Sequence, residues 1–303
     1  MKQRIKNRII AISGEPVSGK GTAIKQIIKN LKEEGFKEEN IHLIATGHQF
    51  RDYFEKIIEF MKSIDDPKKL KELGQDEVLK KIIENNEYRS IIIKTISKIQ
   101  KNNIDLNDIN KISELNNSEI FAELRNIIDK IIEDNTKAIG EEINQKERPN
   151  EIWIFDSRIA FNYIPNAFSV KLTVSSTEAA RRLINDTSRG EEDRYKTIEE
   201  AEIAREERRI GEIKRYKEKY GINLEDDSNF DLIIDTTFAE IKDIAKTILR
   251  CEELYREGKH FGRNWASSFT MIPSQTIMET LRPQIGSVWT LEKLEKEIKE
   301  KRI

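Results

Sequence analysis

The chain has 303 residues, a net charge of −2 and 36% charged residues, so no overall basic field favours binding to nucleic acid or to a membrane surface. A single cysteine excludes an internal disulfide framework, and the three histidines show no metal-ligand spacing alongside it. No apolar stretch approaches the roughly 20 residues of a membrane-spanning helix, and the basic N-terminus does not lead into a signal-peptide pattern. These features predict a cytoplasmic protein.

The first predicted strand, Ile9–Ile12, leads into a glycine-rich loop. Residues 14–22 read Gly-Glu-Pro-Val-Ser-Gly-Lys-Gly-Thr, and a helical pattern follows from Ala23 to Leu31. Glycines let backbone N–H groups turn around phosphate oxygens, and the helix offers its positive N-terminus. A simple turn between strand and helix is the alternative, but it does not explain a lysine directly after the second glycine. The pattern predicts a nucleoside triphosphate site formed by Gly14, Ser18, Gly19, Lys20, Gly21 and Thr22.

Four further apolar runs predict buried strands. They are Ile41–Ala45, Ile152–Phe155, Val170–Val174 and Leu232–Ile234. Most are followed by helical patterns, which is typical of a parallel sheet with helices on both faces. The sequence therefore predicts an α/β protein, a doubly wound five-stranded parallel sheet of the P-loop NTPase type, with its core over residues 1–255.

Residues 51–150 interrupt this core with about a hundred positions whose isoleucines recur at helical spacing, so we expect a helical insertion with its loop near residues 101–117. A lid is predicted over residues 185–220. Within it, a capping box at Thr197 starts a long charged helix that should end at Gly221. A closing helix is expected over residues 238–255.

Residues 256–303 form a predicted C-terminal extension. It carries aromatic residues, prolines and a final charged helix that Thr290 would cap, over residues 291–302. The apolar side chains there would suit a docking surface for a protein partner, although packing back on the same domain is the alternative. They are Trp265, Phe269, Ile272 and Trp289.

Charged residues also follow the predicted strands. Asp156 ends the third strand, where a carboxylate can hold magnesium through water, or simply cap a turn, and Arg158 lies two residues later. Thr46 and Arg51 follow the second strand. Because the carboxyl ends of parallel strands share one edge, Arg51 and Arg158 could clamp an acceptor phosphate. A surface ion pair is the alternative for Arg158.

A second group of arginines lies in the predicted lid and the helix before it. Arg208, Glu212 and Arg215 are spaced i, i+4, i+7 and so share one helix face, which could close over phosphates or be an ordinary solvated salt-bridge face. Of the neighbours Arg181 and Arg182, one is expected to flank the nucleotide, and Arg182 is our choice. Arg189 and Arg194 are either lid arginines or loop charges.

The order of these motifs resembles nucleoside monophosphate kinases, most of all the cytidylate kinase family. The match comprises Gly14–Thr22, Thr46–Arg51, Asp156–Arg158 and, most specifically, Arg215–Ile222 with Asn229–Thr236. It covers roughly residues 5–60 and 120–250. The resemblance implies ATP and Mg²⁺ as cofactors and a nucleoside monophosphate as acceptor. It implies these catalytic residues: Lys20, Arg158, Arg208 and Arg215.

The resemblance also implies roles for the remaining site residues. Thr46, Arg51 and Arg158 would bind the acceptor, with Glu212 contacting its sugar or orienting the arginines. Gly21 replaces a common serine or threonine, so magnesium would rest mainly on phosphate oxygens and water, with Thr22 near the α-phosphate.

One departure concerns the base. Bacterial cytidylate kinases carry an aspartate that helps to read cytosine where this chain has Ile159. CMP or dCMP is the expected acceptor. There are two alternatives. One is a small-molecule kinase with another acceptor, and the other is a regulatory nucleotide-binding module with a partner-docking tail.

Overall fold

The computed structural model describes residues 7–63, 76–106, 118–164, 166–185, 195–257 and 269–270. By their contacts the residues form two units, which are described separately. The first consists of residues 1–44 and 139–303, and the second consists of residues 45–138. The predicted final helix, the arginines at 189 and 194, and all but two residues of the aromatic tail segment lie outside the described residues.

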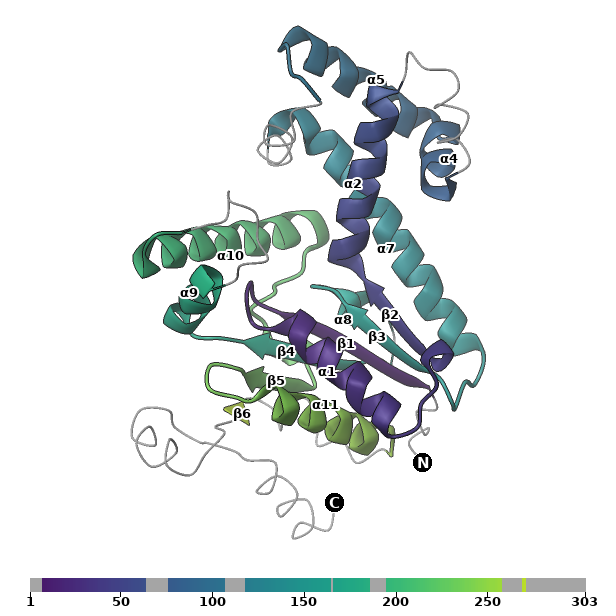
Figure 1. Cartoon of the computed structure of the whole chain (residues 1–303). Helices are drawn as coiled ribbons and strands as arrows, with labels where there is room; N and C mark the ends of the chain where they lie inside the picture. The colour runs from purple at the N-terminus through teal and green to yellow at the C-terminus, as the bar shows by residue number, and fades with distance from the viewer. Residues whose placement is uncertain are drawn as a thin grey trace. The chain divides into compact units, whose positions relative to one another are not determined.

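A parallel sheet forms the centre of the first unit (Figure 1). Its strands are β1 (Arg8–Gly14), β2 (Ile41–Ala45), β3 (Ile152–Asp156), β4 (Phe168–Thr173), β5 (Leu232–Asp235) and β6 (Phe269–Thr270). Their order across the sheet is β2-β3-β1-β4-β5-β6. The five predicted strands are confirmed. The sixth was not predicted, because two residues are too short to produce an apolar run, and it pairs with β5 in parallel at Ile234 and Phe269.

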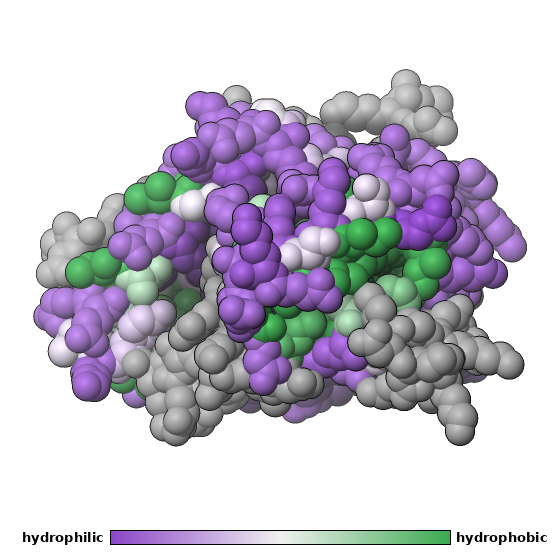
Figure 2. Space-filling model, turned by 90° about the horizontal axis from the view of Figure 1, so that it is seen from above, coloured by the Kyte–Doolittle hydropathy of each residue, from purple (hydrophilic) through white to green (hydrophobic). Residues whose placement is uncertain are grey.

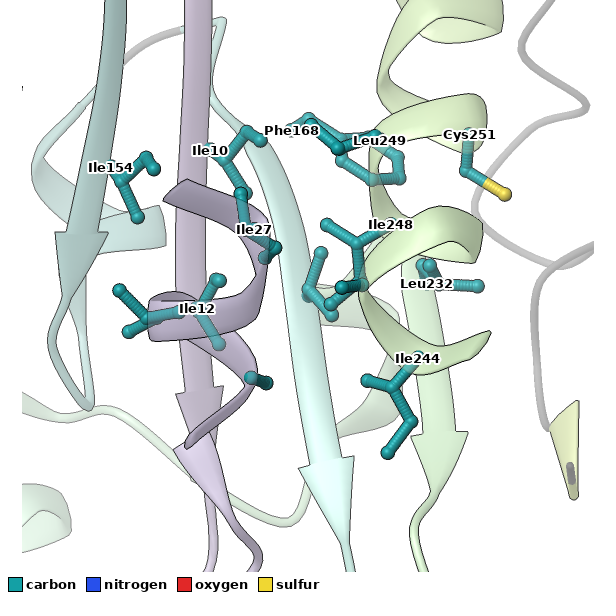
Figure 3. Close-up of a cluster of buried hydrophobic side chains, with 14 of the residues drawn as sticks. Ile10, Ile12, Ile27, Ile154, Phe168, Leu232, Ile244, Ile248, Leu249 and Cys251 are labelled. Carbon is teal, nitrogen blue, oxygen red and sulfur yellow. The ribbon is translucent and has the colours of Figure 1, made fainter. Parts of the chain in front are cut away.

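Each face of the sheet buries one alternating set of β1 side chains. Ile10 and Ile12 face α1 (Lys20–Glu33) and α11 (Ile241–Arg256), and Figure 3 shows them beside Ile27 of α1. Ile9 and Ala11 belong instead to a cluster with residues of α8 (Ala160–Tyr163) and the end of α7 (Ala122–Gln145). Every residue of β1 is buried, which is why its central residues, Ile9–Ile12, form a continuous apolar run.

Helices α9 (Ser176–Asn185) and α10 (Ile198–Tyr220) follow β4 and contact each other. The Thr197 hydroxyl accepts the N–H of Glu200 at 3.2 Å, and the Glu200 carboxylate accepts the N–H of Lys196 at 2.9 Å. Gly221 ends the helix with a φ of 68°, a conformation that glycine adopts without steric cost. The long capped helix predicted from the sequence is therefore confirmed. Short 3₁₀ turns occupy η1 (Glu38–Asn40) and η4 (Asp227–Asn229).

The second unit is helical, as the insertion was predicted to be. It contains α2 (Thr46–Lys62), α4 (Glu77–Glu84), α5 (Asn86–Lys101), η2 (Glu119–Phe121) and most of α7 (Ala122–Gln145). Its core gathers the isoleucines that recur at helical spacing, among them Ile82, Ile127 and Ile128. Asp76 and Asn85 cap α4 and α5 by accepting backbone N–H groups.

Across the described parts of the chain, no helix combines the length and apolar character needed to cross a membrane. The face of the molecule in Figure 2 carries mostly hydrophilic residues, with a contiguous apolar area near its centre.

Candidate functional site: a phosphate loop and a cluster of cations

The glycine-rich loop between β1 and α1 has an unusual backbone. Gly19 has a φ of 83° and Val17 a φ of 65°, and a β-branched residue at positive φ costs on the order of 1–2 kcal/mol. The Val17 side chain packs against Ala180 and Leu183 of α9, which offsets this strain. The loop is therefore held in a conformation that its own backbone preferences would not select.

Contacts from neighbouring strands and α9 also hold the loop. The Thr236 hydroxyl lies 3.0 Å from the Ser18 carbonyl oxygen, and the Glu15 N–H donates to the Leu172 carbonyl at 3.1 Å. Arg182 donates to the Thr236 carbonyl at 2.6 Å and to its hydroxyl at 3.2 Å. Arg182 thus lies beside the loop, 3.5 Å from the Val17 carbonyl oxygen, and its role in flanking a nucleotide stays a prediction. Arg181 is exposed and pairs with its helix neighbour Glu178.

The loop ends at the N-terminus of α1. Gly19 is the N-cap, no side chain in the described structure caps the helix, and its first turn carries no acidic residue. The first N–H groups and the positive end of the helix dipole are therefore available to an anion. Gly21 and Thr22 are exposed in this first turn, where the prediction places the triphosphate.

Gly14 is required by close packing. A Cβ atom on Gly14 would lie 2.6 Å from the Leu172 carbonyl oxygen and 2.6 Å from the Ser18 hydroxyl. We expect Gly14→Ala to displace the loop from β4 and lower the free energy of unfolding by about 1–3 kcal/mol. Chemical denaturation without nucleotide measures this. Gly21→Ala is the control, because a Cβ there meets nothing within 4 Å, and it should leave stability unchanged or raised. Equal effects of the two variants would contradict the packing argument.

Charged side chains gather where β3 ends next to β1. Asp156 ends β3 and pairs in register with Ile12 of β1. Arg158 then reaches the Glu212 carboxylate of α10 at 2.9 Å, and both side chains are mostly buried. Arg208, one turn earlier on α10, donates to the same carboxylate at 3.3 Å. The structure thus places Arg158, Arg208 and Glu212 together, whereas the spacing predicted only that Arg208 and Glu212 share a helix face.

Lys20 lies within the field of this cluster. The pKa of Lys20 is lowered from 10.5 to about 8, chiefly by burial and also by the charges of Arg158 and Arg208, while Asp156 and Glu212 oppose the shift. Four predicted site residues therefore act on the lysine of the loop. A bound anion would raise the pKa of Lys20 back towards its ordinary value.

The lowered pKa predicts that phosphate binding takes up a proton. Above pH 8 the free protein increasingly holds Lys20 neutral, and a bound triphosphate raises the lysine pKa towards its ordinary value. At pH 9, where the triphosphate itself is fully ionised, we expect an uptake of up to about one proton per site and weaker binding than at pH 7. Calorimetry in two buffers of different ionisation enthalpy measures the uptake. Lys20→Arg is the control, since arginine stays protonated; equal uptake by this variant would contradict the assignment.

The structure does not test the predicted roles of three other residues. The guanidinium of Arg215 stacks on the Tyr216 ring at 5.1 Å, so its role in phosphate binding stays a prediction. Thr46 and Arg51 lie on α2 in the second unit, and their convergence with Arg158 also stays a prediction. Ile159, which the sequence resemblance aligns with the base-reading aspartate of bacterial cytidylate kinases, is buried.

Sequence reasoning missed Arg205. This residue of α10 is 5% exposed, and its guanidinium forms an ion pair with Glu15, the second residue of the loop. Its position gives no distinguishing signal, because Arg209 lies one turn further along the same run of charged residues.

The residues at the site fit magnesium only in combination with a phosphate ligand. Within the described ranges, no group of three His, Cys, Asp or Glu side chains is placed to hold a metal ion. Asp156 and Thr22 supply one carboxylate and one hydroxyl. Magnesium prefers six oxygen ligands and retains water, so phosphate oxygens and water would have to complete its coordination.

Comparison with known protein families finds no match. A cytidylate kinase from Thermoplasma volcanium is 38% identical over 61 residues, which are 20% of this chain and 32% of that kinase. An S-adenosylmethionine-dependent nucleotide dehydratase from Lacinutrix mariniflava is 29% identical over 115 residues, 37% of this chain and 23% of the dehydratase. The similarity thus spans less than a third of either relative.

A solved structure, TT1252 from Thermus thermophilus, aligns over 82% of this chain and 97% of its own, with 11% identity and a TM-score of 0.39, which is too low to carry an argument. The sheet, the loop and the partial similarities support a P-loop kinase-like fold in a nucleotide-related protein.

Proposed function

We propose that the chain is an ATP- and Mg²⁺-dependent kinase that transfers the γ-phosphoryl group to a nucleoside monophosphate, with CMP or dCMP as the preferred acceptor. The observation that carries the proposal is the cluster of Lys20, Arg158 and Arg208 at one sheet edge, beside an uncapped helix N-terminus. Phosphoryl transfer needs positioning and charge neutralisation more than covalent chemistry, and this cluster supplies both.

In this proposal the loop amides, Gly14–Thr22, bind the ATP phosphates and Lys20 neutralises charge on the transferred group. Arg158 binds the acceptor phosphate together with Arg51. Arg208 and Arg215 of α10 belong to the lid and close over the phosphates. Asp156 holds magnesium through water. Glu212, which pairs with Arg158, orients the arginines or contacts the acceptor sugar.

The partial similarity to a cytidylate kinase supports a nucleotide acceptor, and the dehydratase is likewise named for acting on nucleotides. The choice of cytosine rests on the sequence resemblance. The side chain of Ile159 is buried and carries no polar group that could read the base.

A panel of all common ribo- and deoxynucleoside monophosphates, assayed with ATP and Mg²⁺ for ADP release, tests the proposal. The expected result is turnover with CMP or dCMP above the other acceptors. Turnover with a different nucleotide would show that the proposed acceptor base is wrong, while the proposed kinase reaction would stand. ATP binding without turnover on any nucleotide would refute the nucleotide acceptor and favour a kinase for another small molecule on the same scaffold.

A further inference from the structure

Arg205 is an unusual residue for its place in the fold. Its side chain is 4% exposed, although most residues of α10 face solvent. One terminal nitrogen, Nη2, contacts both the Glu15 carboxylate and the Val174 carbonyl oxygen, the latter at 3.3 Å. The Nε atom is buried without a hydrogen-bond partner in the described structure. Burying a guanidinium with an unsatisfied donor is costly, so packing alone does not account for this residue.

Glu15 is equally unusual, since it is a carboxylate within an anion-binding loop. Its backbone takes part in the loop's first turn, because its N–H donates to Leu172 and its carbonyl accepts the Ser18 N–H at 3.2 Å. A negative side chain here opposes the binding of phosphates by like-charge repulsion. Its pairing with Arg205 removes most of that repulsion and fixes the side chain to one side of the loop.

We propose that Arg205 is a positioning residue for the phosphate donor: by pairing with Glu15 it neutralises the loop's own carboxylate and holds the loop ready for a triphosphate. This inference rests on the proposed function only in assuming that the loop binds ATP. It assigns Arg205 to the donor, through Glu15, and thus separates it from Arg208 and Glu212, which lie with Arg158.

The test measures the dissociation constant of Mg²⁺-ATP for the full chain by calorimetry, without an acceptor. Arg205→Met is expected to weaken binding about tenfold, because Glu15 becomes an unpaired charge near the phosphates. Glu15→Gln alone should bind ATP at least as tightly as the unmodified protein. The double variant Arg205→Met with Glu15→Gln should recover affinity to within about threefold of the unmodified protein.

Arg209→Met is the matched control. Arg209 is also an arginine and lies one turn after Arg205 on the same helix. Unlike Arg205, it forms ion pairs on the surface, with Glu206 and Glu225 at 2.7 Å each. Its removal should leave ATP affinity unchanged. If Arg205→Met does not fold, Arg205→Lys replaces it, with an expected loss of about threefold because lysine keeps the charge but not the planar fork.

The outcomes separate the two proposals. Unchanged ATP affinity in the Arg205 variant, or a double variant as weak as the single one, would overturn the positioning role, since a merely structural loss is not rescued by Glu15→Gln. Failure of the unmodified protein to bind ATP would refute the proposed function itself.

Discussion

Replacing Lys20 with methionine is expected to abolish phosphoryl transfer and at the same time to stabilise the unliganded protein at neutral pH. Transfer should fall at least about 10²-fold, since the charge that meets the transferred phosphate is lost. The folded protein lowers the pKa of Lys20 from 10.5 to about 8, so it pays a free-energy penalty to keep the lysine protonated. That penalty is on the order of 3 kcal/mol at most, and methionine removes it.

The sign of the pH dependence makes this prediction specific. Below pH 8 both folded and unfolded chains hold the proton, so the penalty is fully present, and it disappears as the pH rises from 8 towards 10.5. The stability gain of Lys20→Met, measured by urea unfolding, should therefore be largest at pH 7 and shrink above pH 8. Lys25→Met, at an exposed position of α1, is the control and should change neither stability nor activity. A loss of stability in Lys20→Met would contradict the claim that the protonated Lys20 destabilises the folded protein.

Replacing Arg158 with methionine is expected to raise the KM for the acceptor about 30- to 100-fold, with a much smaller effect on the affinity for ATP. A guanidinium can bind an acceptor phosphate through two charge-assisted hydrogen bonds, and each contributes about 1–2 kcal/mol. Arg158→Lys should restore only part of the loss, because an ammonium group cannot make the paired contact. Initial-rate kinetics with each substrate varied in turn separate the two effects.

Arg250→Met is the matched control for this experiment, since Arg250 forms a single ion pair with Glu253 on α11. It should change neither KM. If Arg158→Met weakened ATP and acceptor equally, the division of the site into donor and acceptor parts would be wrong, and Arg158 would belong to the whole cluster of charges around Lys20.

The sheet and its helices were predictable because both faces of the sheet are covered. Such strands leave continuous apolar runs, as in β1, and the loop after β1 has a spacing that few other structures produce. Helix α10 was predictable from both ends, by Thr197 and Gly221. The two-residue β6 was not, since its pairing depends on a distant strand and leaves no local pattern.

The candidate site was predictable where chemistry coincides with a strand end, as for Lys20, Asp156 and Arg158. It was less predictable on helices. Sequence did not distinguish Arg205 from its neighbour Arg209, because both lie in a run of alternating charges, and burial depends on how α10 is turned. For the same reason Arg182 contacts the loop while Arg181 points to solvent.

The two ion pairs of α10 also determine how that helix can lie along the sheet edge. Arg205 meets Glu15, and Glu212, seven residues or about 10 Å further along the helix, meets Arg158. A shift of two turns in one direction would bring Glu212 to Glu15, and a shift in the other direction would bring Arg205 to Arg158. Each would set like charges against each other, so the order of charges specifies a single axial register for the helix.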